Sequence, residues 1–216
     1  MKKIFAFIVL SVCIIYQLNA QNENFKLTGD ARTGSGFAPL FGLKTSEQWS
    51  AFYMVDLQSK SGFGIGAYRI TDFQKEGLGR IGFFDLYWSK TTSKNTSVYS
   101  AIEYGFFDNN KKLSFWCPYI IFNWNNSFSK IDFSPMYCYY DKTKSDQFVF
   151  RLRTVKEIYK GGTLRISGWY NNLLVHKFYG AVGFTQQLPK NFYLQGDILL
   201  FREKKTQPML SLGYKF

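Results

Sequence analysis

Residues 147–155 read QFVFRLRTV, and apolar and polar side chains alternate along this stretch. On an extended strand, successive side chains point to opposite faces, so the stretch has one apolar and one polar face. The apolar face carries Phe148, Phe150 and Leu152, and the polar face carries Gln147, Arg151 and Arg153. In a membrane barrel the apolar face contacts lipid and the polar face looks into the lumen. The stretch therefore predicts a membrane-spanning strand that directs two arginines inward.

The same alternation recurs in TLRISGWY at 163–170 and NFYLQGDILL at 191–200. Each of these stretches again places a charge on its less apolar face, Arg165 in the first and Asp197 in the second. A soluble β-sandwich also alternates, so segment length and aromatic placement must decide between the two architectures. Most segments reach the 9 to 11 residues that a membrane strand needs, and many begin or end with Trp, Tyr or Phe, as interfacial girdles require.

Segments rich in Phe, Tyr, Trp, Ile and Val follow one another along the chain, separated by short polar turns such as SKSG and LPKN. They lie near 25–33, 47–58, 62–73, 78–90, 96–107, 112–124, 127–140, 147–155, 162–171, 174–187, 191–201 and 207–216. We expect an all-β fold, an antiparallel transmembrane up-and-down β-barrel of about 12 strands. A ten-stranded barrel is the alternative, because FKLTGDART is a weak segment and VKEIYKGG could be strand rather than turn.

The N-terminal segment has the features of a secretory signal peptide. Lys2 and Lys3 precede the apolar run IFAFIVLSVCII, and LNA before Gln21 is a small-residue cleavage site. We therefore expect a signal peptide over residues 1–20 and an outer-membrane β-barrel over residues 21–216. A lipoprotein signal with Cys13 as the lipidated residue is the rival interpretation, and the large Val12 before that cysteine disfavours it.

At its C-terminus the chain resembles the outer-membrane β-barrel proteins of Gram-negative bacteria. It ends in SLGYKF, in which Leu212, Tyr214 and Phe216 alternate with polar or small residues. The resemblance implies that this terminal strand is the signal read by the barrel-assembly machinery, and that outer-membrane lipid and lipopolysaccharide surround the barrel. The cleavage before Gln21 and the Asn- and aromatic-rich composition are similar to exported proteins of the Bacteroidota.

The formal net charge is +12, and 20% of the residues are aromatic, a combination also found in nucleic-acid-binding proteins. Export argues against a nucleic-acid partner. The lysines are moreover scattered through short polar connections instead of following one face, as Lys111, Lys112, Lys204 and Lys205 illustrate. We therefore expect no nucleic-acid binding.

Two cysteines remain after the predicted cleavage, Cys117 and Cys138. If the strands around them turn at Asn125-Asn126, the two thiols lie four positions out of register, roughly 13 Å apart. A disulfide cannot span that distance, so none is expected. The sequence has neither a CxxC motif nor a His/Cys cluster, and we predict no metal site and no cofactor.

The charged residues expected to face the lumen suggest a passive transport function. Arg151, Arg153 and Arg165 lie on consecutive segments and could form a basic ladder. The other candidates for lining the lumen or a solute are Lys130, Asp132, Glu103 and Asp197. Mixed charges of this kind indicate either a network of ion pairs that fills the lumen or a narrow channel for small anionic or sugar-like solutes. A non-conducting structural or adhesion barrel that displays surface loops is the alternative function.

A second alternative is a lipid A or phospholipid hydrolase that uses His176, the one histidine of the chain. Outer-membrane enzymes of this kind pair a histidine with a serine, and two residues of spacing on a strand would put both on one face. His176 is instead followed by Lys177 and Phe178, and Ser167 is the nearest serine in sequence. We therefore predict no catalytic residues.

Overall fold

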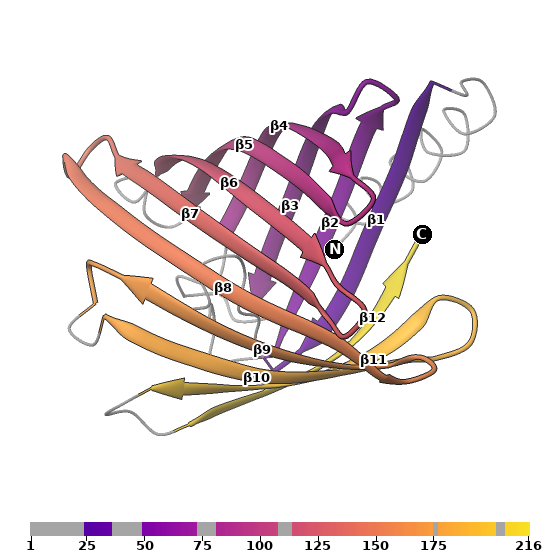
Figure 1. The fold of residues 1–216 in the computed structure, drawn as a ribbon. Coiled ribbons are helices and arrows are strands. Elements are labelled where there is room, and N and C mark those ends of the chain that lie inside the picture. The colour runs from indigo at the N-terminus through magenta and orange to yellow at the C-terminus, as the bar shows by residue number, and fades with distance from the viewer. Residues whose placement is uncertain (1–23, 36–48, 73–80, 108–113, 175–176, 202–205) are drawn as a thin grey trace, which may run out of the picture.

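The structure is a computed structural model that describes residues 24–35, 49–72, 81–107, 114–174, 177–201 and 206–216. These residues form twelve β-strands in one antiparallel sheet (Figure 1). The strands are β1 (Phe25–Gly34), β2 (Ser50–Ser59), β3 (Phe63–Asp72), β4 (Ile81–Ser93), β5 (Thr96–Phe107), β6 (Phe115–Asn125), β7 (Lys130–Tyr140), β8 (Ser145–Tyr159), β9 (Gly162–Asn171), β10 (Phe178–Gln187), β11 (Phe192–Phe201) and β12 (Gln207–Lys215). The predicted signal peptide lies outside the described residues.

Each strand pairs with its neighbours in sequence, and β1 pairs with β12, so the sheet closes on itself. The prediction of twelve strands in an up-and-down barrel is confirmed, and the ten-strand alternative is wrong. The stretch VKEIYKGG divides between β8, which runs to Tyr159, and a turn at Lys160 and Gly161. Because the strand number is even, β1 begins and β12 ends at the same end of the barrel, which we call the terminal end.

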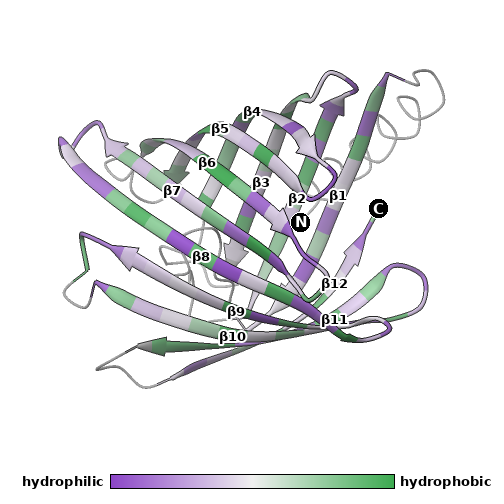
Figure 2. Cartoon of the chain, viewed as in Figure 1, coloured by the Kyte–Doolittle hydropathy of each residue, from purple (hydrophilic) through white to green (hydrophobic). Residues whose placement is uncertain are grey.

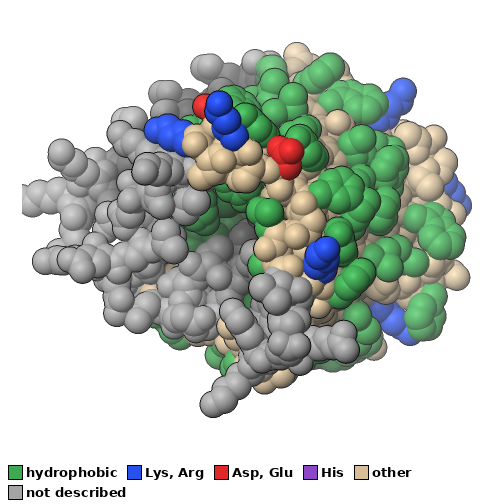
Figure 3. Space-filling model, turned by 90° about the vertical axis from the view of Figure 1, so that its left-hand side faces the viewer, with side chains coloured by type: hydrophobic (Ala, Val, Ile, Leu, Met, Phe, Trp, Pro, Cys, Tyr) green, Lys and Arg blue, Asp and Glu red, His purple; other side chains and the backbone are tan. Residues whose placement is uncertain are grey.

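Buried and more exposed positions alternate along the strands, as in β7, and hydrophobic and hydrophilic residues follow one another along them (Figure 2). Outward positions carry large apolar side chains, and Leu152 is 55% exposed. Figure 3 shows such side chains gathered broadly over the described surface, with only isolated charges among them. A soluble protein would place these side chains in its core, whereas a barrel in lipid places them outside. The outer surface is therefore that of a membrane-spanning barrel.

Glycine and aromatic residues fit together where strands approach closely on the inner face. Gly213 of β12 pairs with Tyr193 of β11, and a Cβ built on this glycine would overlap the tyrosine ring. Gly64 of β3 stands in the same relation to Tyr87 of β4. A side chain at either glycine would displace the neighbouring ring, so these positions require glycine.

The interior is apolar toward the end away from the termini. This apolar layer is made of inward side chains from six strands, and all of its members are buried. They are Ile70, Ile81, Phe83, Phe115, Met136, Val149 and Leu199. Charged inward side chains lie closer to the middle of the strands. The lumen thus divides along its axis into an apolar layer and a charged belt.

The structure corrects the predicted spacing of the cysteines. The connection between β6 and β7 is Asn126–Ser129, where Asn126 Oδ1 accepts hydrogen bonds from the N–H groups of Phe128 (2.8 Å) and Ser129 (2.7 Å). This turn is longer than the assumed one at Asn125-Asn126, and it shifts the register by four residues. Cys117 therefore lies directly opposite Cys138, with a Cα–Cα distance of 4.0 Å, and the two form a disulfide. The expectation that no disulfide forms was wrong because the turn was placed too early.

Candidate functional site

A cavity of about 620 Å³ lies in the charged belt of the lumen. Side chains from both sides of the barrel line it. They include Arg151, Arg153, Arg165, Asp85, Tyr119 and Asp197. Alternation alone positions them, because each occupies an inward position of its strand and lies near mid-strand. The cavity is the candidate binding site for a solute.

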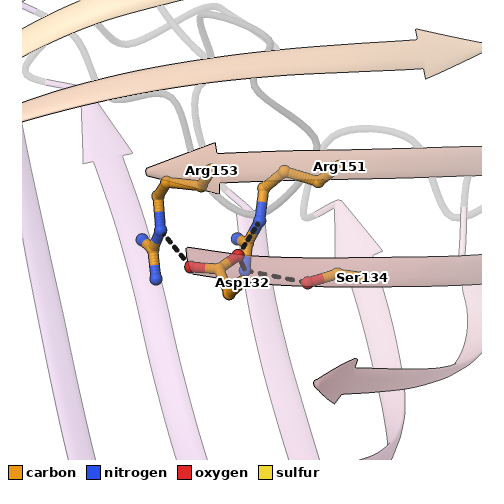
Figure 4. A network of polar contacts seen from close by, with 4 residues as sticks. All are labelled: Asp132, Ser134, Arg151 and Arg153. Carbon is orange, nitrogen blue, oxygen red and sulfur yellow. Dashed lines mark hydrogen bonds and ion pairs between the residues drawn. The ribbon is translucent and has the colours of Figure 1, made fainter. Parts of the chain in front are cut away.

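Asp132 on β7 joins two of the arginines on β8 (Figure 4). Its Oδ1 accepts hydrogen bonds from Nε (3.1 Å) and Nη2 (2.9 Å) of Arg151, and its Oδ2 accepts one from Nε of Arg153 (2.5 Å). The Arg151 Nη2 also donates to Oγ of Ser134 at 3.0 Å. The side chains of Asp132 and Arg151 are 5% and 6% exposed, whereas that of Arg153 is 37% exposed. Two cations share one carboxylate, so this cluster keeps an excess positive charge that faces the cavity.

Arg165 on β9 has its own carboxylate partner. Its Nη2 lies 2.7 Å from Oδ1 of Asp197 on β11, and its Nη1 donates to Oγ1 of Thr185 on β10 at 2.7 Å. The ion pair reaches across β10 because Gly183, directly between the two strands, has no side chain: a Cβ there would overlap the Asp197 carboxylate. Gln195 donates to the second oxygen of Asp197 at 2.6 Å. The aspartate is thus held by two donors, and the guanidinium is fixed at the cavity wall.

Another ion pair lies near the seam between β1 and β12. Nε of Arg32 is 3.2 Å from Oδ2 of Asp30, and the guanidinium carbon of Arg32 lies 4.2 Å from the ring centre of Phe52. The hydroxyl of Tyr193 donates to Oδ1 of Asp30 at 2.6 Å. These four residues also line the cavity. Arg32 adds a fourth guanidinium to the charged belt.

The other side of the lumen carries carboxylates whose hydrogen-bond donors are tyrosines. Oδ2 of Asp56 accepts from Tyr87 at 2.8 Å, and Oδ2 of Asp85 accepts from Tyr119 at 3.3 Å. Tyr68 donates to Oε2 of Glu103. Their rings pack against other aromatic rings, as in the stacked pair of Tyr68 and Phe83. We call Asp56, Asp85, Glu103 and these three tyrosines the carboxylate–tyrosine wall.

The residues predicted to line the lumen occupy different places in it. Arg151, Arg153, Arg165 and Asp197 line the cavity, and Asp132 is buried behind the first two arginines. Glu103 is fully buried on the opposite side, and Lys130 begins β7 at the terminal end and is not among the residues that line the cavity. A role of these residues in binding a solute stays a prediction. His176 lies outside the described residues.

Two groups of lumen residues were missing from the sequence-based prediction. Asp30 and Arg32 were overlooked because FKLTGDART has little apolar alternation, although a period of two from Lys26 would have placed both inward. Tyr193 was expected to face inward and does so, whereas Tyr68, Tyr87 and Tyr119 were overlooked, and Tyr87 was assigned to an interfacial girdle because it lies next to Trp88. Among the described residues there is no group of three or more His, Cys, Asp or Glu side chains that could hold a metal ion.

No family model and no curated protein sequence matches the chain. Several solved structures have a similar fold. KdgM porin, solved in complex with disordered oligogalacturonate, gives a TM-score of 0.65 at 11% identity, over 88% of this chain and 99% of that one. The chain shares its fold with these porins.

Two further structures extend the comparison. NanC porin gives a TM-score of 0.62 at 11% identity, over 87% of this chain and 98% of that one. An outer membrane channel from Pseudomonas putida F1 gives 0.53 at 12% identity, over 88% of this chain and 94% of that one. At such identities the likeness concerns the fold, and the lumen must be interpreted from this chain's own residues.

Proposed function

We propose that the protein is a narrow passive channel in a bacterial outer membrane, for small acidic or sugar-like solutes. The observation that carries this proposal is the lumen cavity of about 620 Å³, lined by Arg151, Arg153 and Arg165. A guanidinium presents up to five donors in a planar fork that matches a carboxylate. Arg153 contacts Asp132 through its Nε and its side chain is 37% exposed, so its guanidinium is accessible to a solute.

Similar folds support the proposal. KdgM porin was solved with oligogalacturonate, an acidic sugar polymer, and the protein from P. putida F1 is described as an outer membrane channel. The outward apolar surface supports placement in a membrane. We further propose that lipopolysaccharide surrounds the barrel and that Leu212, Tyr214 and Phe216 form the signal read by the barrel-assembly machinery. A signal peptide over residues 1–20 and a Bacteroidota source remain predictions from the sequence.

Planar-bilayer recording of the purified protein tests the channel proposal. We expect discrete current steps, and in a KCl gradient a reversal potential on the anion-selective side. Absence of current from correctly folded protein would favour the alternative, a non-conducting barrel that displays its loops. Absence of lipase and deacylase activity, with a current present, would leave the hydrolase alternative without support.

The arginines can be tested with Arg153→Gln combined with Arg165→Gln. This pair leaves the buried Arg151 with Asp132 and so preserves that contact. Loss of two cations from the cavity wall should lower the anion-to-cation permeability ratio by a factor of about two or more. Arg69→Gln is the matched control, because Arg69 lies at an outward position of β3. An unchanged permeability ratio in the double variant would show that Arg153 and Arg165 do not line the permeation path.

A further inference from the structure

The charges of the lumen are separated across its width. In the closed ring of twelve strands, β2 to β5 lie across from β8 to β11. Arg151, Arg153 and Arg165 stand on β8 and β9, whereas the three acids of the carboxylate–tyrosine wall stand on β2, β4 and β5. The cavity touches both sides, since Asp85, Tyr68 and Tyr119 line it together with the arginines. A solute in the cavity therefore meets guanidinium groups on one side and the carboxylate of Asp85 on the other.

No cation of the protein neutralises the carboxylate–tyrosine wall from its own strands. The described inward positions of β2 to β5 hold no Lys or Arg, and Arg69 on β3 faces outward. Arg32 on the adjacent β1 is engaged with Asp30 and Phe52. Tyrosine hydroxyls are thus the partners that the structure gives to these acids, and a hydroxyl supplies a hydrogen bond but no positive charge.

Two carboxylate oxygens of this wall also lack a donor. Asp85 and Glu103 face each other directly on β4 and β5. Glu103 is 0% exposed, and its Oε1 and the Oδ1 of Asp85 have no hydrogen-bond partner among the described residues. Like charges placed opposite each other on adjacent strands are unfavourable, and a buried carboxylate oxygen without a donor is costly. A positively charged hydrogen-bond donor would reduce the repulsion between the two carboxylates and would also give these oxygens a partner.

We infer that the lumen selects compact zwitterionic solutes, which carry a carboxylate and an ammonium group. This inference rests on the proposed channel function and names the chemical class of its solute. The carboxylate of the solute would face Arg153 and Arg165, which are both more exposed than Arg151. Its ammonium group would face Asp85, supported by Asp56 and Glu103. An ammonium supplies three donors and a full charge, which the tyrosines cannot.

Three probes of nearly equal size test the inference. Serine carries both charges, glycerate replaces the ammonium group by a hydroxyl, and serinol keeps the ammonium group but lacks the carboxylate. Efflux of each radiolabelled probe from proteoliposomes is measured at low concentration, where flux follows occupancy of the site. We expect serine to leave at least about threefold faster than either of the other probes, the ratio expected for one weak ion pair.

Variants then test whether the carboxylate–tyrosine wall causes the preference for serine. Asp85→Asn combined with Glu103→Gln retains the carbonyl acceptors for Tyr119 and Tyr68 while removing the charges. The serine rate should fall to that of glycerate, and the glycerate rate should not fall. Asp146→Asn, at an outward position of β8, is the matched control and should leave all three rates unchanged. Heat-modifiable electrophoretic mobility reports whether each variant forms the closed barrel.

The outcomes separate this inference from the proposed function. If none of the probes leaves faster than from empty liposomes and no current is seen, the channel function itself fails. If current is normal but glycerate leaves as fast as serine, the zwitterion inference is overturned and the channel stands. The inference is also overturned if the double variant changes the selectivity between Na⁺ and Cl⁻ but not the ratio of serine to glycerate, because the wall would then serve inorganic cations.

Discussion

Gly29 and Phe216 exchange two backbone hydrogen bonds across the seam that closes the barrel. The N–H of Gly29 donates to the carbonyl of Phe216 at 2.9 Å, and the N–H of Phe216 donates to the carbonyl of Gly29 at 3.1 Å. The ring of Phe216 lies over Gly29, where a Cβ would overlap it. Phe216 is therefore part of the closure of the barrel.

Replacing Gly29 by valine should weaken the seam. The added side chain displaces the Phe216 ring, and overpacking of this kind costs about 1–3 kcal/mol. Urea titration of the refolded protein in lipid vesicles, followed by tryptophan fluorescence, measures the change in the free energy of unfolding. Gly168→Val on β9 is the control, because no atom lies within 4 Å of a Cβ built there. Equal losses in both variants would point to a general effect of strand glycines.

Asp132→Asn should destabilise the barrel by about 3 kcal/mol, because it leaves the buried Arg151 guanidinium without a counter-charge. Ser134→Ala removes only one neutral partner of the same guanidinium and should cost about 1 kcal/mol. The two variants are compared in the same urea titration. A smaller loss for Asp132→Asn than for Ser134→Ala would mean that the ion pair contributes little net stability.

Leu152→Arg places a charge near the middle of the lipid-facing surface of β8. The expected loss in the free energy of unfolding is about 2–4 kcal/mol, since charges on the lipid face cost most at the bilayer midplane. Lys156→Arg, four residues toward the terminal end on the same face, should change it by less than about 1 kcal/mol. The cation of Lys156 already lies there, 3.3 Å from the ring centre of Phe128. A tolerated Leu152→Arg would place this surface outside the hydrocarbon layer.

Removal of the disulfide by Cys117→Ser with Cys138→Ser should lower the free energy of unfolding by up to about 3 kcal/mol, the entropy expected for a closed loop of this length. Reduction of the parent protein with dithiothreitol in urea should give the same loss. The single variants Cys117→Ser and Cys138→Ser should show the same loss in the free energy of unfolding, because each of them already breaks the bond. If the reduced parent unfolds at the same urea concentration as the oxidised one, the register of β6 and β7 holds without the bond.

The number of strands, and the face of the wall to which each side chain points, were predictable from the sequence. Both follow from the alternation of apolar and polar residues, which is a local pattern that repeats in each strand. The stretch 147–155 placed Arg151 and Arg153 on the inner face, and the structure agrees. Pairing across strands was less predictable, since it depends on turn length: the Asn126–Ser129 turn decided whether Cys117 meets Cys138. The ion-pair partners of the lumen charges could not be predicted from the sequence for the same reason. Arg165, for example, reaches Asp197 only across a glycine on the strand between them.

The position of the disulfide also bears on the order of events during assembly. Both cysteines are 0% exposed and occupy inward positions of adjacent strands. An oxidising enzyme is far larger than a lumen that holds a cavity of about 620 Å³, so it cannot reach these sulfurs once the ring is complete. Formation of the bond by an enzyme therefore requires that the chain is still open. If the bond forms in that order, β6 and β7 enter assembly as a covalently linked hairpin. Their register is then fixed before the first and last strands pair.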